Sequence, residues 1–137
     1  MDLKSFLNKG NKGNETFEYV PTQKFKDENG KAIPWTFKKL NIDEYETIRD
    51  ECTSVNFADK GKTKFNNTLF NKKIVCNSVV EPNLNNAELQ DSYGVKRAED
   101  LITKLFDNAG EYYQLLAHLL EVNGFKSLSE DVEEAKN

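Results

Sequence analysis

"KFKDENGKAIPWTF", residues 24–37, is the stretch that decides the fold of the amino-terminal third. Asn29-Gly30 at its centre is a dipeptide typical of tight β-hairpin turns. On both sides of this turn, every second residue is apolar, as in a strand with one buried face: Phe17, Tyr19, Ile33, Trp35 and Phe37. We therefore predict an antiparallel hairpin over about residues 15–40.

The loop length sets the register of this hairpin. A two-residue loop would place Phe25 opposite Pro34, on the face away from Ile33. A three-residue loop over 28–30 places Phe25 opposite Ile33 and requires Gly30 in the left-handed conformation. We predict the three-residue loop because it keeps both apolar residues on one face. Pro34 cannot donate a ladder hydrogen bond, so it favours an edge position for its strand.

Helical signals follow the hairpin. Asn41 and Glu44 form a capping box at the start of a helix with a narrow apolar stripe, composed of Tyr45, Ile48, Cys52 and Val55. The next segment, NFADKGKTKFNN, is a polar connection. A further helix is expected from about Asn67 to Glu81, where Pro82 disfavours its continuation.

The most densely specified stretch is SVVEPNLNNAELQDSYGV, residues 78–95. Asn85 and Glu88 have the spacing of a second capping box, and Leu84 and Leu89 that of a hydrophobic staple. Gly94 is a left-handed helix stop, beyond which Val95 folds back. Chain geometry accounts for each of these residue types, so we interpret the stretch as a structural corner.

Two helices complete the ordered chain. In the first, the apolar residues keep helical spacing: Ala98, Leu101, Ile102, Leu105 and Phe106. In the second, over 109–123, apolar residues cover roughly 220° of the wheel, about twice what one core contact requires. Either this helix is central and packed on two sides, or part of its surface is available to a partner.

These elements predict the α+β class. An amino-terminal β-hairpin or small antiparallel sheet over about 15–40 precedes a mostly helical carboxyl-terminal two-thirds, with helices over about 42–123. We expect a flexible arm over 1–14, a single domain over 15–126 and an acidic, frayed tail over 127–137.

Composition limits the classes of partner. The 137 residues carry a net charge of −4, with 17 lysines and two arginines. Nucleic-acid readers depend on arginine and a basic face, so we expect no nucleic-acid binding. No run is long or apolar enough for a membrane span or a signal peptide, so we expect a cytoplasmic protein without a membrane partner.

No catalytic constellation is recognisable. His118 lies on the polar arc of its helix and is expected to be solvated. Cys52 and Cys76 lack metal-site spacing and are expected to be small buried thiols. Trp35 is first a core residue and second an interface anchor. We therefore expect no enzyme activity, no metal and no cofactor.

The chain resembles the XkdN-like phage tail assembly chaperones over roughly residues 3–126. The resemblance rests on KFKDENGKAIPW, on SVVEPNLNNAELQDSYGV, and on the downstream AEDLITKL, GEYYQLL and NGF. It implies a factor, acting in the cytoplasm of a bacterial host, that keeps the tape-measure protein competent while tail-tube protein polymerises around it. It also implies that the factor is missing from the mature particle.

The alternative function is a structural tail or baseplate component that remains in the particle. For either function, the surplus apolar surface of helix 109–123 is the candidate partner-binding surface, with possible self-association as a competing use. The residues expected to contribute are Tyr112, Tyr113, Leu116, Leu120 and Trp35.

Overall fold

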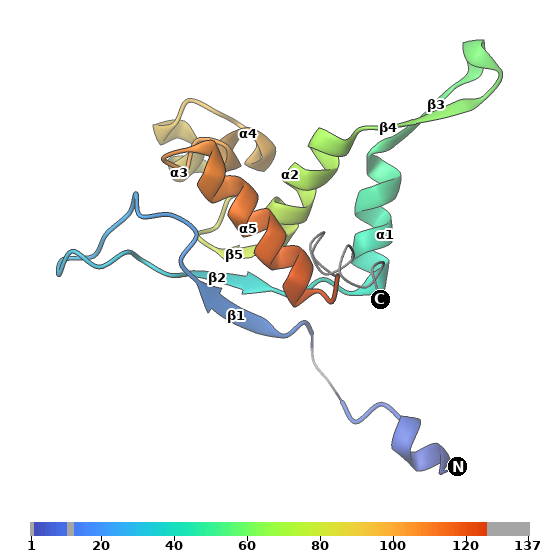
Figure 1. Cartoon of the computed structure of the whole chain (residues 1–137), viewed down its shortest axis with the longest axis horizontal. Coiled ribbons are helices and arrows are strands. Elements are labelled where there is room, and N and C mark those ends of the chain that lie inside the picture. Colours follow the sequence, from blue (N-terminus) through green and yellow to red (C-terminus); the bar gives the residue numbers. More distant parts are fainter. Residues whose placement is uncertain (1, 11–12, 126–137) are drawn as a thin grey trace, which may run out of the picture.

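The computed structural model describes residues 2–10 and 13–125 (Figure 1). In chain order the elements are β1 (Thr16–Tyr19), β2 (Trp35–Lys38), α1 (Ile42–Glu51), β3 (Thr53–Asn56), β4 (Lys62–Phe65), α2 (Asn67–Ser78), β5 (Val79–Glu81), α3 (Ala87–Ser92), α4 (Ala98–Ile102) and α5 (Ala109–Val122). Short 3₁₀ turns span Leu3–Phe6 and Phe57–Asp59. The predicted α+β class is confirmed. The predicted acidic tail and residues 1 and 11–12 of the predicted arm lie outside the described residues.

The main sheet has the strand order β1-β2-β5, and both pairings are antiparallel. Phe17 lies opposite Phe37 and Tyr19 opposite Trp35, so the alternating residues share one face as predicted. The edge position predicted from Pro34 is wrong, because β2 is the central strand. Pro34 immediately precedes β2, where its missing N–H removes no ladder hydrogen bond.

The tip of the β1–β2 hairpin has the predicted three-residue loop. Lys26 pairs with Ala32, the Ile33 N–H donates to the Phe25 carbonyl at 2.9 Å, and Gly30 has φ +79°. Between this tip and the β1–β2 ladder, residues 20–24 lie opposite the single residue Pro34. The extra length forms a bulge, within which Thr22 is buried and faces α5.

The helices lie above the sheet in the view of Figure 1 and enclose the core against it. Helix α2 contacts α1, α4 and α5, so it is the centre of the helical layer. Lys73 on α2 pairs with Glu51 at 3.0 Å and with Glu99 at 3.2 Å, which ties α1 and α4 to it. The largest fully buried apolar side chains come from the sheet, from α2, α4 and α5, and from the α4–α5 connection: Phe37, Ile74, Val75, Leu101, Ile102, Leu105, Leu115 and Leu119.

The corner over residues 78–95 differs from its prediction in two details. Helix α2 ends at Ser78, and Val79–Glu81 then pair with β2 as strand β5 rather than continuing the helix. The cap of α3 is Asn86, whose side chain accepts from the Leu89 N–H, so the predicted box at Asn85 is wrong by one residue. The predicted stop is confirmed, since Gly94 has φ +69° and the Val95 N–H donates to the Gln90 carbonyl at 3.1 Å.

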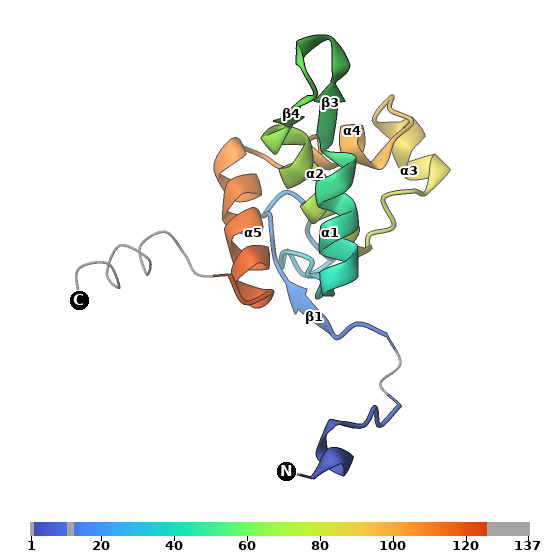
Figure 2. The same cartoon turned by 90° about the vertical axis from the view of Figure 1, so that its right-hand side faces the viewer.

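The segment predicted as a polar connection forms a second hairpin, β3–β4. It projects away from the helical layer in two perpendicular views (Figures 1 and 2). Val55, predicted on the buried stripe of the preceding helix, is in β3 and 48% exposed. Helix α1 ends at Glu51, so the stripe it contributes to the core stops at Cys52.

Candidate functional site

A groove of about 630 Å³ lies between α1 and the carboxyl-terminal end of α5. We call it the α1–α5 groove. In Figure 2, helices α5 and α1 stand to the left and right, above β1. Its lining is Leu40, Asn41, Ile42, Tyr45, Glu46, Arg49, Asp50, Thr53, Ile74, Leu120, Asn123 and Phe125. Apolar side chains form the floor, and α1 contributes charges of both signs along one wall.

The end of α5 determines the shape of this groove. Asn123 Nδ2 donates to the Leu119 carbonyl and its Oδ1 accepts from the Leu40 N–H, both at 2.8 Å. Gly124 has φ +91°, and the Phe125 N–H donates to the Leu120 carbonyl at 2.9 Å. This left-handed stop turns the chain so that Phe125 reaches α1.

Two apolar side chains at the rim are open to solvent. Ile42, the first residue of α1, is 75% exposed, and Phe125 is 43% exposed. The Tyr45 ring lies between the layers, with its centroid 5.2 Å from that of Phe125 and 5.5 Å from that of Phe70. The groove therefore offers an apolar, aromatic surface that is already formed in the free chain.

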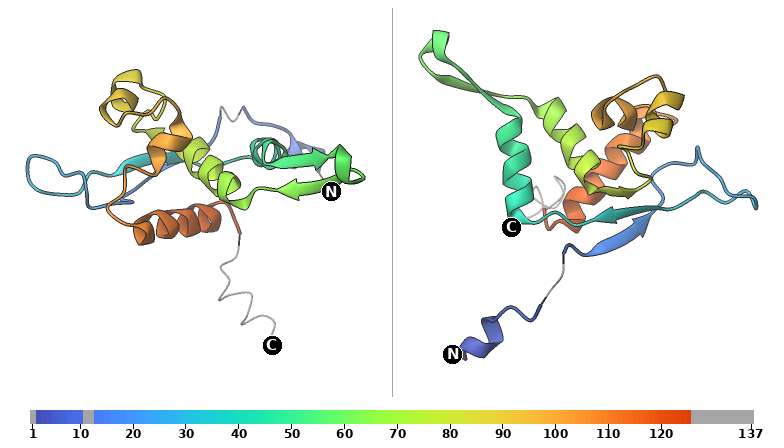
Figure 3. Two further views of the ribbon diagram at one scale, coloured as in Figure 1. Left: turned by 90° about the horizontal axis from the view of Figure 1, so that it is seen from above. Right: turned by 180° about the vertical axis from the view of Figure 1, so that it is seen from behind.

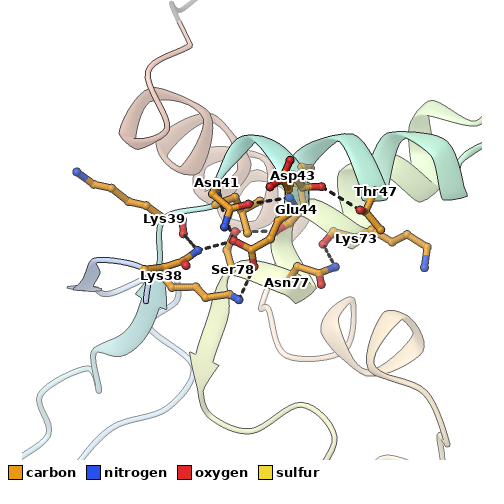
Figure 4. A network of polar contacts seen from close by, with 12 residues as sticks. Lys38, Lys39, Asn41, Asp43, Glu44, Thr47, Lys73, Asn77 and Ser78 are labelled. Atoms are coloured by element: carbon orange, nitrogen blue, oxygen red, sulfur yellow. Dashed lines mark hydrogen bonds and ion pairs between the residues drawn. The ribbon is translucent and has the colours of Figure 1, made fainter. Parts of the chain in front are cut away.

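A polar network holds the start of α1 against β2 beside this groove (Figure 4). The Glu44 carboxylate accepts from Lys38 Nζ at 2.7 Å, from the Asn41 N–H at 3.1 Å and from the Asn14 amide. The Asn41 side chain accepts from the Glu44 N–H at 2.8 Å, so the predicted capping box is confirmed. Burial raises the pKa of Glu44, but hydrogen bonds from Lys38, Asn41 and Asn14 outweigh it and lower that pKa to about 2.

Replacing Glu44 by glutamine should make the protein less acid-sensitive and less stable at neutral pH. A carboxylate with a depressed pKa stabilises the fold fully above its ordinary pKa of 4.5, and this contribution is lost as pH falls toward about 2. We expect E44Q to lower the free energy of unfolding by roughly 2 kcal/mol at pH 7 and by much less at pH 2.5. Urea unfolding across this range measures both values.

The matched control is Glu46→Gln, one turn from the same cap and exposed to solvent. It should leave both the stability and its acid dependence at the wild-type values. An E44Q variant whose stability falls with acid as steeply as that of the wild type would contradict the assigned role of Glu44.

The residues predicted as a partner-binding set do not form one surface. Leu120 lines the α1–α5 groove, whereas Tyr112 and Tyr113 line a separate hollow of about 520 Å³ between the amino-terminal ends of α2 and α5. Leu116 is only 8% exposed and Trp35 only 3%, and both belong to the core cluster. Of the five residues, Tyr113 is the one with a largely open side chain, at 58%.

The Tyr112 hydroxyl is buried and has no hydrogen-bond partner within the part of the chain that the structure describes. Burial, and then the nearby Cys76 and Tyr113, raise the pKa of Tyr112 to about 12. The group is therefore neutral at physiological pH. The aromatic ring packs edge-on against Phe106, with centroids 5.6 Å apart, so its visible role is packing.

His118 and the two thiols also serve packing. His118 was predicted to be solvated, but it is half-buried and stacks on Tyr19 with ring centroids 4.1 Å apart. Cys52 is buried as predicted, and Cys76 is half-buried with its pKa raised by burial to about 12. Among residues 2–10 and 13–125, no three His, Cys, Asp or Glu side chains are grouped to hold a metal ion. Within the same ranges, no helix has the length and apolar character needed to cross a membrane.

Sequence reasoning missed the groove because its rim comes from helix ends. Ile42 follows the cap residue Asn41, and Phe125 follows the stop residue Gly124. Neither belongs to a periodic apolar stripe like the one from which the partner-binding residues on helix 109–123 are predicted. An apolar residue directly after a cap or a stop is the signal that identifies such a rim.

Residues 3–136 match the model of a family described as phage XkdN-like tail assembly chaperone proteins. Two proteins of Bacillus subtilis strain 168 are similar in sequence. YqbN is 28% identical over 123 residues, covering 88% of this chain and 83% of that protein. The phage-like element PBSX protein XkdN is 29% identical over 122 residues, covering 86% and 82%. A crystal structure of the protein YqbN has the same fold, with a TM-score of 0.76 and 23% identity over 92% of this chain and 98% of that chain.

Proposed function

The chain belongs to the phage XkdN-like tail assembly chaperone family, and from that premise we propose that it binds the tape-measure protein through the α1–α5 groove. Binding would keep this client assembly-competent while tail-tube protein polymerises around it. The chain would act in the cytoplasm of the bacterial host, without catalysis, and leave before the particle is complete.

The observation that carries this proposal is the open apolar rim of the groove. Ile42 and Phe125 present exposed apolar atoms across a preformed floor that contains Leu120 and Tyr45. A client helix with apolar residues at i, i+3, i+4 and i+7 fits such a surface. Covering the rim removes apolar area from water, and each fully buried large side chain contributes roughly 2 kcal/mol.

The groove also supports reversible binding. Arg49, Glu46 and Asp50 on α1 give one wall both signs of charge, so the client can be oriented without a deeply buried ion pair. A site about the size of one helix face, with solvated charges at its edge, favours transient association over permanent assembly. This property favours a chaperone that departs over a tail or baseplate component that remains.

Co-expression with the tape-measure protein of the same gene cluster tests this proposal. The wild-type chain should increase the soluble fraction of that protein and co-purify with it. Ile42→Asp should abolish both effects, because it places a charge at the rim. An acidic residue is favourable in the first turn of a helix, so this variant should remain folded.

Val80→Asp is the matched control. Val80 is 42% exposed on β5, away from the groove, so this variant should solubilise the client as well as the wild type does. Loss of binding in Tyr113→Asp but not in Ile42→Asp would move the client to the α2–α5 hollow. A client that is equally soluble without this chain would contradict the chaperone function, and recovery of the chain in purified particles would favour the structural alternative.

A further inference from the structure

The β3–β4 hairpin is structurally incomplete in a single chain. Its two strands form a sheet of their own, and all eight strand residues are exposed. Figure 3 shows the hairpin extending beyond the body when the molecule is seen from above and from behind. A lone two-stranded ribbon is only marginally stable in water, whereas additional strands stabilise it.

The two faces of the hairpin differ in chemistry. Thr53 lies opposite Phe65 and Val55 opposite Thr63, so these four residues share one face. Ser54 opposite Lys64 and Asn56 opposite Lys62 form the other face. On the first face, Val55 is 48% and Phe65 is 44% exposed, and Phe57 directly after β3 is 88% exposed.

The two edges of the hairpin also differ. Strand β4 carries Lys62 and Lys64, which protect an edge against strand addition, whereas β3 carries no charge. The Asn66 N–H donates to the Cys52 carbonyl at 2.8 Å, which places Cys52 and Asn66 in a hydrogen-bonded pair of the ladder.

Hydrogen-bonded and non-hydrogen-bonded pairs alternate along an antiparallel ladder. Because Cys52 is in a hydrogen-bonded pair, the residues two and four positions later, Ser54 and Asn56, also direct their backbone N–H and carbonyl groups toward β4. Thr53 and Val55 therefore direct theirs toward the outer edge of β3, which pairs with no other strand among the described residues.

We propose that this edge binds a second copy of the chain, with the two β3 strands antiparallel and Val55 opposite Val55 of the second copy across a two-fold axis. Both Val55 residues then exchange their N–H and carbonyl groups in one hydrogen-bonded pair. This register keeps the face with Val55 and Phe65 continuous over four strands, whereas a shift by one residue would mix the two faces. Phe57 of each copy comes over Thr53 of the other.

Charge supports a second copy as the occupant. The tip carries exposed Lys60 beside an Asp59–Lys62 ion pair, so its net charge is positive. The antiparallel arrangement brings it toward the carboxyl end of α1 in the second copy, where Asp50 and Glu51 are exposed. The β4 lysines of the two copies are separated by three strand spacings, about 14 Å. That separation exceeds the Debye length of roughly 8 Å at physiological salt, so their repulsion is weak.

Sedimentation velocity over a range of concentrations tests the association. The wild-type chain should form a dimer, and Val55→Pro should be monomeric, because proline removes the outward N–H while leaving the β3–β4 ladder intact. Val55→Thr keeps that N–H and should still dimerise. A monomeric wild type, or a Val55→Pro variant that dimerises like the wild type, would overturn the proposal.

Cross-linking tests the register. In the proposed pair, Val55→Cys places two thiols on adjacent strands, within reach of a short bis-maleimide. Thr63→Cys lies on the same face of the hairpin, yet its thiols would be about 14 Å apart. We expect at least a tenfold higher yield of covalent dimer for Val55→Cys, and none from the wild-type cysteines. Equal yields for the two variants would overturn the register.

Discussion

Replacing Phe37 by alanine is expected to lower the free energy of unfolding by about 4 kcal/mol. Phe37 is fully buried in the central strand β2. The centroid of its ring lies 5.6 Å from that of Phe17, 6.2 Å from that of Trp35 and 6.3 Å from that of Tyr19. These neighbours are held by the β1–β2 ladder, so they cannot move into the cavity that alanine leaves. Domains are typically stable by about 5–15 kcal/mol, so the variant would lose a large share of its stability.

Urea unfolding at fixed pH measures this loss, with Phe6→Ala as the control. Phe6 is 71% exposed, so its removal should change the free energy of unfolding by no more than about 0.5 kcal/mol. A loss below about 2 kcal/mol in Phe37→Ala would mean that the surrounding rings repack, and that the sheet does not hold them as the structure indicates.

The parts of the fold that could be predicted from the sequence are those with local causes. The loop over 28–30, the cap formed by Asn41 and Glu44, and the stop at Gly94 each depend on neighbouring residues. The choice between two loop lengths was decided by the side on which Phe25 would fall. Each of these features is present in the structure.

The parts that could not be predicted depend on distant pairing. Val79–Glu81 continue an apolar run after α2, and nothing local shows that they pair with β2. The hairpin of β3 and β4 is exposed on both faces, so nothing in it gives the strict alternation of apolar and polar residues that indicates a half-buried strand. Pro34 was misread because proline before a central strand and proline in an edge strand give the same local pattern.

The same limit applies to the candidate site. The wide apolar arc of α5 left open whether the helix is packed on two sides or offers surface to a partner, and in the structure α5 buries Leu115, Leu116 and Leu119. The apolar arc in the sequence could not show which part of the surface of α5 stays exposed in the folded chain. Glu111 and the bulge over 20–24 cover one side of the first turn of α5, and Phe125 returns across its last turn. The hydrogen bonds from Thr22 and Gln23 to Glu111 link residues 89 and 88 positions apart along the chain, beyond the reach of periodicity.

Replacing Glu111 by alanine is expected to cost about 3 kcal/mol, because its carboxylate joins three segments. It accepts from Thr22 Oγ1 at 2.8 Å, from the Asp107 N–H at 2.9 Å and from the Gln23 N–H at 3.1 Å. Thr22 is 2% exposed, so alanine would leave a buried hydroxyl without its acceptor. Burial acts to raise the pKa of Glu111, but these hydrogen bonds lower it, so the stabilisation is lost as pH falls below the ordinary range of a carboxyl group.

Glu111→Gln and Glu121→Ala separate the causes of this loss. Glutamine keeps the length of the side chain but turns one acceptor into a donor, so it should recover about half of the stability and remove the acid dependence. Glu121 is exposed on the same helix, and its replacement should change stability by at most about 0.5 kcal/mol. Hydrogen exchange should show the bulge over 20–24 opening in Glu111→Ala while the β1–β2 ladder stays protected. If the bulge kept wild-type protection, the carboxylate would not be what holds it to α5.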